Sequence, residues 1–416
     1  MSCFYGIDEA KIREYARLIA RTGINVQKGQ EIILNCPVEY YEFGRFVIEE
    51  LYTAGAGEVV VRWNDTFDTR QYYLHADEAH LTTVPDWKAD SFLYYSRRGA
   101  GYVSIAGSDP EAFKGVDPKR MQTRQSVMNK ALIEHYKLQM ASEIPWTVAA
   151  VPQQKWAAKV FPELPVDEAM AKLWELILKA VRIDTGDAVQ AWANHDAFLK
   201  GKCKMLNDYA FEKLHYENSI GTDFTVGLVK NHIWEGGSEV AGMTGTVFEA
   251  NMPTEEIFTM PDCRVAEGTL VSALPLSYHG NLIKNFRLTF HEGQVVDYSA
   301  EEGYESLKSL IETDEGSRRL GEVAIVPYSS PISQMKTLFY NTLFDENASC
   351  HFALGECYPT TVEGGAAMSE EELAAIGGNQ SDNHVDFMVG TADLKITGIK
   401  ADGEQIVIFE NGDWVE

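Results

Sequence analysis

Short β-branched runs alternate with helical periodicities through the first 190 residues, and this alternation most limits the folds open to the chain. The runs at residues 32–34 and 59–61 are typical of buried strands, and a helical pattern at 41–51 separates them. Further strands are expected at residues 102–105 and 147–151, and helices at 9–21, 121–140 and 169–181. Strands that alternate with helices form parallel sheets covered on both faces. The sequence therefore predicts an α/β fold built from βαβ units.

The pattern changes near residue 190. Beyond it we expect strands at residues 218–228, 282–290, 294–298 and 406–409, and a helix at 304–312. His291-Glu292-Gly293 would form the hairpin turn between two of these strands. A chain of 416 residues exceeds one ordinary core. We predict two domains: an N-terminal, mostly parallel α/β domain at 1–190 and a C-terminal α+β metal-site domain at 191–416.

The composition is acidic, with 62 Asp and Glu against 36 Lys and Arg and a formal net charge of −26. Such a chain repels phosphate backbones and anionic membranes, so we expect no nucleic-acid or membrane partner. No apolar run reaches the roughly 18 residues of a membrane span. The cysteines lack paired spacing, which is typical of reduced thiols, and residues 1–8 lack the pattern of a secretory signal. We expect a soluble, cytoplasmic protein.

Several familiar catalytic patterns are missing. The sequence contains no G-x-S-x-G elbow, no HExxH and no Walker pattern. Ala54-Gly55-Ala56-Gly57 is no dinucleotide loop, because it would follow a helix and open a strand. We expect it to cap the helix and turn the chain.

His384 and Asp386 are the clearest candidates for chemistry. Side chains at i and i+2 of a strand point to one face, so these two would present ligand atoms toward one point. The apolar run at 387–389 follows directly, which favours a buried position, and buried ionisable groups need partners or a metal. Taken alone, the pair could also belong to a surface strand with alternating polar residues.

Other candidates in the second half have ordinary explanations as well. His351 lies on an apolar stretch that is also typical of a structural histidine. Glu255 or Glu256 could stabilise a helix start after Thr254, and Glu322 opens an apolar strand. Together, nitrogen and carboxylate donors suit zinc, cobalt or manganese and favour metal-assisted hydrolysis. The other histidines have no carboxylate at strand spacing in an apolar run, and we expect structural or exposed positions for His75, His80, His135, His195, His215, His232, His279 and His291.

Four segments resemble, in the same order, the aminopeptidase T/aminopeptidase S family of cocatalytic metal-dependent aminopeptidases, often called the thermophilic metalloprotease family. The segments are NMPTEEIFT at 251–259, GEVA at 321–324, SCHFALGECY at 349–358 and NQSDNHVDFMVG at 379–390. The likeness covers nearly the whole chain. It implies two-domain homodimers that bind two divalent metal ions in each subunit.

The resemblance also implies a set of site residues. Its metal ligands would be Glu256, Glu322, His351, His384 and Asp386, with Tyr358 at the same site. Glu256 is preferred to Glu255 because it occupies the family's ligand position. Glu322 is the expected bridge between two ions. Glu322 and Tyr358 are the expected catalytic groups. Glu322 or Glu256 would shuttle the proton to the leaving amine, and Tyr358 would either ligate a metal or donate to the oxyanion.

The sequence therefore predicts a metalloaminopeptidase that hydrolyses N-terminal residues from peptides with a free N-terminus. A dinuclear amidohydrolase or dipeptidase with the same ions is an alternative. A metal-stabilised binding protein without activity is another, from a different class.

Overall fold

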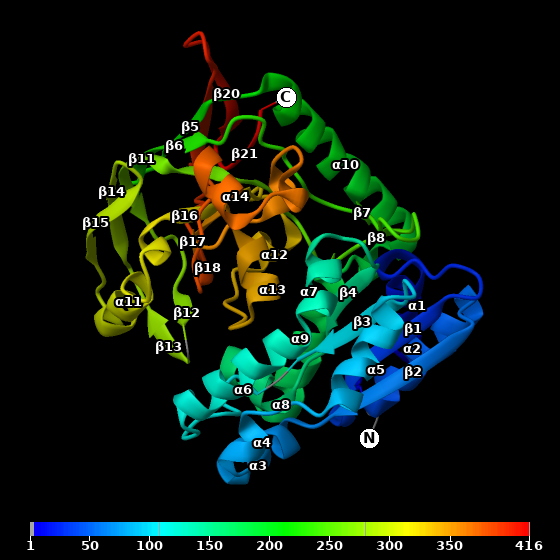
Figure 1. Cartoon of the computed structure of the whole chain (residues 1–416). Coiled ribbons are helices and arrows are strands. Elements are labelled where there is room, and N and C mark those ends of the chain that lie inside the picture. The colour runs from blue at the N-terminus through cyan, green and yellow to red at the C-terminus, as the bar shows by residue number, and fades with distance from the viewer. Residues whose placement is uncertain (1–3, 108, 279, 416) are drawn as a thin grey trace. The chain divides into compact units, whose positions relative to one another are not determined.

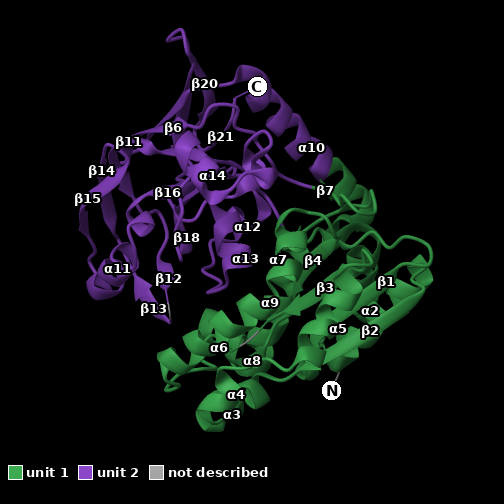
Figure 2. Cartoon of the chain, in the orientation of Figure 1, with its two compact units in different colours: residues 1–194, 238–253 green, residues 195–237, 254–416 purple. Residues whose placement is uncertain are grey.

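The computed structural model describes residues 4–107, 109–278 and 280–415 (Figure 1). The chain forms two compact units: unit 1 holds residues 1–194 and 238–253, and unit 2 holds residues 195–237 and 254–416 (Figure 2). The segment 238–253 therefore packs with unit 1, although it follows part of unit 2 in the sequence. The contiguous domains expected at 1–190 and 191–416 stay a prediction.

Unit 1 is built on a parallel sheet with strand order β2-β1-β3-β4-β9. Its strands are β1 (Glu31–Pro37), β2 (Glu58–Asn64), β3 (Gly101–Ala106), β4 (Trp146–Ala150) and β9 (Asn251–Met252). Consecutive strands β1, β2, β3 and β4 are separated by helices, as the alternation of patterns predicts. The expected α/β class is confirmed. A two-stranded ribbon, β7 (Glu239–Val240) and β8 (Val247–Phe248), also belongs to this unit.

The helices of unit 1 follow the predicted pattern with one correction. They are α1 (Glu9–Leu18), α2 (Tyr41–Ala54), α3 (Thr66–His75), α4 (Glu78–Leu81), α5 (Asp86–Ser96), α6 (Pro118–Ala131), α7 (Ile133–Met140), α8 (Gln154–Val160) and α9 (Val166–Ala180). Gly55 caps α2 with φ +117°, which confirms the predicted cap. The single helix expected at 121–140 is wrong. Leu132 breaks it with φ −109° and ψ 13°, and this side chain is buried at the break, so packing overrides helical periodicity.

Helix α10 (Ala188–Tyr209) runs from the residues of unit 1 into those of unit 2. The largest sheet of unit 2 has the order β15-β14-β11-β6-β5-β19-β20-β21 and is antiparallel. Its strands are β5 (Lys213–Glu217), β6 (Asp223–Leu228), β11 (Pro261–Val271), β14 (Arg287–His291), β15 (Gln294–Ser299), β19 (Lys395–Ile399), β20 (Gln405–Glu410) and β21 (Asp413–Trp414). The hairpin between β14 and β15 is confirmed. The expected strand at 282–290 is divided in two, because Asn285 adopts φ +47°, which no extended strand allows.

Unit 2 also contains a second, antiparallel sheet and several short elements. They are β12 (Leu276–Tyr278), β13 (Asn281–Ile283), α11 (Tyr304–Ile311), α12 (Pro331–Met335), α13 (Thr342–Asp345) and α14 (Glu370–Ile376). The second sheet, which we call the site sheet, has the order β10-β16-β17-β18. Its strands are β10 (Ile257–Thr259), β16 (Leu320–Ile325), β17 (His351–Gly355) and β18 (His384–Met388).

One face of the site sheet packs into the apolar core of unit 2. This face carries Val323 and Ile325 from β16, Phe352 and Leu354 from β17, and Phe387 from β18. The residues between them in each strand point to the opposite face. That opposite face is therefore free to hold polar side chains at a buried position.

A bulge at Gly321 makes this arrangement possible. Leu320 pairs with Leu354, and Glu322 pairs with Ala353, so β16 contains one extra residue. Leu320 can then join the core while Glu322 points to the other face. A Cβ on Gly321 would lie 2.1 Å from the carbonyl oxygen of Glu356, so no larger residue fits the bulge.

Among the described residues, no helix combines the length and the apolar character that a membrane crossing requires.

We expect Gly321→Ala to lower the free energy of unfolding by about 1–3 kcal/mol, because the added methyl group must displace backbone. Gly201→Ala in α10 is the matched control, since nothing lies within 4 Å of its added Cβ. There the substitution should stabilise by about 0.5–1 kcal/mol, from helix propensity. Urea unfolding curves measure both. Equal effects at the two positions would contradict the role of the bulge.

Candidate metal centre

Three of the predicted site residues lie on neighbouring strands of the site sheet. Glu322 on β16 is opposite Ala353 on β17, and Ala353 is opposite Asp386 on β18. All three side chains therefore point to the same face, away from the core. Ala353 has only a methyl group, which leaves room between the two carboxylates. His351 and His384 share this face, since each lies two residues from a member of the row.

Glu256 reaches the same face from the residue before β10. Phe258 pairs with Ala324, which places Glu256 two residues further along the same face. The residues at 254–256 are not helical, so the alternative that Glu255 or Glu256 stabilises a helix start is wrong.

Glu255 is held elsewhere. Its Oε2 lies 3.6 Å from Nε2 of His195, and that nitrogen also bonds the carbonyl oxygen of Thr254 at 2.8 Å. Asn347 Oδ1 accepts a hydrogen bond from the backbone N–H of Glu255 at 2.6 Å. His195 was expected to be structural, and it fixes the segment that carries Glu256. Its position here could not be predicted, because α10 is far from this segment in the sequence.

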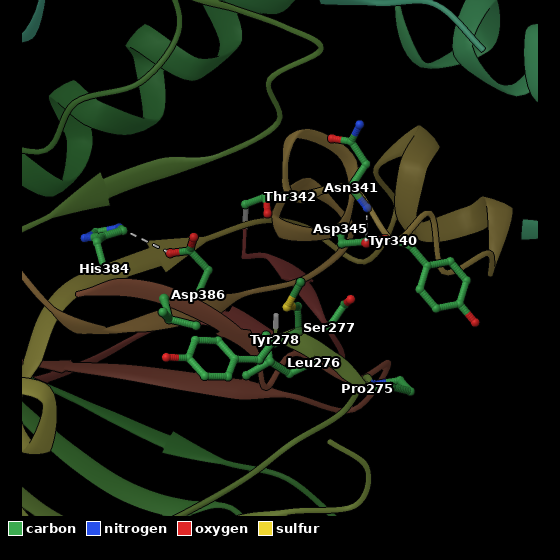
Figure 3. A pocket seen from close by; sticks show the side chains of 12 residues that line it. Pro275, Leu276, Ser277, Tyr278, Tyr340, Asn341, Thr342, Asp345, His384 and Asp386 are labelled. Carbon is green, nitrogen blue, oxygen red and sulfur yellow. Dashed lines mark hydrogen bonds and ion pairs between the residues drawn. The ribbon is translucent and has the colours of Figure 1, made fainter. Parts of the chain in front are cut away.

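The predicted ligands form two groups that share Glu322. Ligand atoms of Glu256, Glu322 and His351 all lie within 4.8 Å of one another, and so do those of Glu322, His384 and Asp386. The closest pairs join an imidazole to a carboxylate. His351 Nε2 is 3.1 Å from Glu256 Oε2, and His384 Nε2 is 3.0 Å from Glu322 Oε2. Figure 3 shows the pair His384–Asp386, whose Nε2 and Oδ1 atoms are 3.4 Å apart.

Backbone carbonyls orient both imidazoles. His351 Nδ1 donates to the carbonyl oxygen of Ser349 at 3.0 Å, and His384 Nδ1 donates to that of Glu356 at 2.8 Å. With Nδ1 engaged in this way, Nε2 of each ring points at the carboxylates. Histidines that bind metals are commonly oriented by such a bond from their second nitrogen.

The ionisation of these groups is strongly perturbed. Burial lowers the pKa of His351, but the hydrogen bond and charge of Glu256 outweigh it and raise the pKa to about 10. Burial also opposes charge on His384, yet Asp386 and Glu322 raise its pKa well above the ordinary value. Burial raises the pKa of Glu322, against the effect of His384. A metal that displaces the imidazole protons would therefore bind more weakly at low pH.

Glu346 joins this cluster, and sequence reasoning missed it. Burial raises its pKa well above the ordinary value, and the charges of Glu256 and Asp386 raise it further. Asn347 Nδ2 lies 3.4 Å from Glu346 Oε1. Glu346 begins a 3₁₀ turn at 346–348 that follows α13 directly. In the sequence it stands among polar residues that resemble a solvated turn, so no periodicity indicates that its side chain is partly buried.

The ring of Tyr358 packs against two neighbours. Its centroid lies 4.8 Å from that of His384 and 5.6 Å from that of Phe258. Burial raises the pKa of Tyr358 well above its ordinary value, and the charges of Glu322 and Asp386 add to this. The phenol is therefore held protonated, as a hydrogen-bond donor.

The donor set fits divalent cations. Four carboxyl groups, those of Glu256, Glu322, Glu346 and Asp386, face two imidazoles. Oδ1 of Asp386 is buried and takes part in no hydrogen bond within the described residues. Like charges gathered in a buried site repel one another unless cations neutralise them. Nitrogen and oxygen donors of this kind suit zinc, cobalt and manganese.

The remaining histidines that the structure describes lie outside these two groups. His135 is buried in unit 1, where its Nδ1 lies 2.7 Å from Ser96 Oγ, and burial lowers its pKa to about 4. His279 lies outside the described residues.

Comparison with known proteins finds relatives that match nearly the whole chain. The sequence profile of the thermophilic metalloprotease (M29) family matches residues 8–414. Aminopeptidase AmpS of Bacillus subtilis is 45% identical over 404 residues, which cover 97% of this chain and 98% of that protein. Aminopeptidase T of Thermus aquaticus is 37% identical over 404 residues, again covering 97% and 98%. The solved structure of wild-type AmpT from Thermus thermophilus matches with a TM-score of 0.90 at 35% identity, over 98% of this chain and 100% of that one.

In the metal-free protein we expect Glu346→Gln to raise the melting temperature at pH 7 by roughly 2–4 °C, since an amide has no charge to desolvate. The folded-state pKa of Glu346 is raised, so the wild type loses stability as pH rises above the ordinary glutamate pKa of about 4.3. The difference between variant and wild type should therefore vanish near pH 4.

Differential scanning calorimetry with a chelator present measures this difference. Glu305→Gln, on the exposed side of α11, is the control and should change nothing at either pH. A variant that melts at or below the wild-type temperature at pH 7 would show that Glu346 is not held in the cluster.

Proposed function

We propose that this chain, which belongs to the thermophilic metalloprotease (M29) family, is a metal-dependent aminopeptidase that removes N-terminal residues from peptides. The observation that carries the proposal is the pair of ligand groups that share Glu322. The names of the two relatives support hydrolysis of the N-terminal peptide bond, since both proteins are aminopeptidases.

Each subunit would hold two divalent ions. Glu256 and His351 would serve one ion, His384 and Asp386 would serve the other, and Glu322 would bridge them. The charges support this number. Four carboxylates with neutral imidazoles carry four negative charges, which two divalent ions balance. One ion would leave two of these charges uncompensated in a buried site.

When bound, such ions would supply an acidified water molecule as nucleophile and polarise the scissile carbonyl. The residues of the chain would do the rest. Glu346 would accept the proton of the attacking water and deliver it to the leaving amine, as general base and then general acid. Its surroundings support this role, because burial raises the pKa of Glu346 well above its ordinary value. Tyr358, held protonated, would donate a hydrogen bond to the developing oxyanion.

The acidic character of the chain also supports recognition of a free N-terminus. With a formal net charge of −26, the protein would attract the α-ammonium group of a peptide. A blocked N-terminus offers no such charge. The proposed substrates are therefore peptides with a free α-amine.

Three further attributes remain part of the proposal. Zinc, cobalt and manganese all suit the donor set. A homodimer is expected from the family resemblance. A cytoplasmic location is expected from the spacing of the cysteines, and the five described cysteines are all free thiols.

Metal titration of the metal-free protein tests the function. We expect activity on a free dipeptide amide to rise as metal is added and to be complete at two equivalents. The same peptide with an acetylated N-terminus should be cleaved at least about 100-fold more slowly. Cleavage of the acetylated peptide at an equal rate would favour the amidohydrolase alternative. A chain that binds metal and cleaves neither peptide would be the inert binding protein.

Two substitutions separate metal binding from proton transfer. Glu322→Gln should lower the bound metal measured by plasma mass spectrometry, because the shared ligand is weakened in both groups. Glu346→Gln should keep two ions and lower kcat by about 100-fold or more. Glu305→Gln should alter neither quantity. If Glu346→Gln retained wild-type kcat with both ions bound, the proton-transfer role would be abandoned.

A further inference from the structure

A pocket with a volume of about 270 Å³ opens beside the candidate metal centre. Every residue that lines it belongs to unit 2. One wall is the strand β18, and the others are the segment 275–278, which includes β12, and the segment 340–345, which includes α13. Figure 3 shows His384 and Asp386 at one side of this pocket and Tyr340 at the other.

The pocket follows the outer edge of β18. Within the residues that the structure describes, this strand pairs with another strand, β17, on one side only. On its other side, the carbonyl oxygen of Met388 accepts a hydrogen bond from the backbone N–H of Ala273 at 2.8 Å. The chain then diverges from β18 toward Leu276 and Tyr278, and the pocket occupies the space between them. A group bound there would lie directly next to the side chains of His384 and Asp386.

Half of the lining residues are apolar or aromatic. They are Pro275, Leu276, Tyr278, Tyr340, Val385 and Met388. Apolar walls with a few polar groups are typical of pockets that bind the side chain of a small ligand.

The charged group in the far wall is already engaged. Asp345 Oδ1 accepts a hydrogen bond from the backbone N–H of Phe339 at 2.7 Å, and its Oδ2 accepts one from that of Asn341 at 3.0 Å. Burial raises the pKa of Asp345 to about 7, which further weakens it as a partner for a cation. None of the described lining residues is a lysine or an arginine. Apart from the proposed ligands His384 and Asp386, the pocket therefore offers no counter-ion to a basic or an acidic side chain.

We propose that this pocket receives the side chain of the substrate's N-terminal residue and selects uncharged, apolar side chains such as those of leucine, methionine and phenylalanine. The proposal rests on the proposed aminopeptidase function, which puts the scissile bond at the ligands. A charged side chain would lose its hydration in the pocket without gaining a partner. An apolar side chain would instead gain from leaving water. In the wild type, kcat/KM for leucyl-p-nitroanilide should exceed that for the lysyl and glutamyl compounds by at least about 10-fold.

Ser277 allows a direct test of the charge preference. It lines the pocket but is exposed, so substitution there should leave folding intact. Ser277→Asp would add a carboxylate to the wall, and the ratio of lysyl to leucyl kcat/KM should rise by about 10-fold. Ser277→Asn has the same shape without the charge and should leave the ratio near the wild-type value. Equal ratios in the two variants would overturn the proposal.

Leu276 tests the size preference. Leu276→Ala would enlarge the pocket, and the ratio of phenylalanyl to leucyl kcat/KM should rise several-fold, by roughly 3–10-fold. The matched control is Leu282→Ala on β13, the strand paired with β12, because Leu282 does not line the pocket. The control should keep the wild-type ratio. A shift of the same size in the control would show a general effect of the hairpin and would overturn the assignment.

Product binding provides a readout that does not depend on turnover. Isothermal titration of the metal-loaded protein should detect binding of L-leucine and L-phenylalanine that is at least about 10-fold tighter than that of L-lysine or L-glutamate. In Ser277→Asp, the difference in affinity between L-leucine and L-lysine should be smaller than in the wild type. A wild type that cleaves none of the aminoacyl compounds would reject the proposed function itself. A wild type that cleaves them with a preference for lysine or glutamate would reject only the pocket assignment.

Discussion

The alternation of side chains along the site sheet is the constraint on which the rest of unit 2 depends. In each strand, every second residue enters the apolar core, and the residues between them are forced to the opposite face. The register then brings Glu322, Ala353 and Asp386 into one row. The bulge at Gly321 is part of the same constraint, because it lets Leu320 face the core and Glu322 face the ligands. The same register of the strands therefore both packs the apolar core and brings the ligand side chains together.

The second consequence of this geometry is a concentration of charge. Carboxylates collect at a buried position where burial raises the pKa of Glu322 and Glu346, and imidazoles beside them are driven toward protonation. The fold tolerates this because the histidines act as internal counter-ions in the metal-free protein. Divalent ions would replace those protons, so metal binding, proton release and stability are linked.

Much of the candidate site could be predicted from the sequence, because residue spacing within a single strand indicates which side chains share a face. His384 and Asp386 are at strand spacing, and β18 does place them on one face. Glu322 was expected at the start of an apolar strand and lies on β16. The resemblance of the motifs predicts that Glu256 and His351 belong to the same site. Spacing alone could not predict this, because both residues are distant in the sequence from His384 and Asp386.

The parts that could not be predicted depend on tertiary packing. Glu346 stands in a polar turn whose burial comes from segments elsewhere in the chain. The helical pattern is interrupted at Leu132, and no Gly or Pro in the sequence indicates this break. The return of the segment 238–253 to unit 1 leaves no compositional boundary in the sequence. Local sequence patterns indicate the periodicity of a helix or strand and which of its faces is buried. The features above are instead set by contacts between segments that are distant in the sequence.

The central claim is that the two ligand groups form one centre for two ions with Glu322 between them. Anomalous diffraction from crystals of the zinc-loaded protein, recorded above and below the zinc absorption edge, tests it most directly. The account predicts two peaks in each chain, one among Glu256, Glu322 and His351 and the other among Glu322, His384 and Asp386. A single peak, or peaks that Glu322 does not contact, would contradict it.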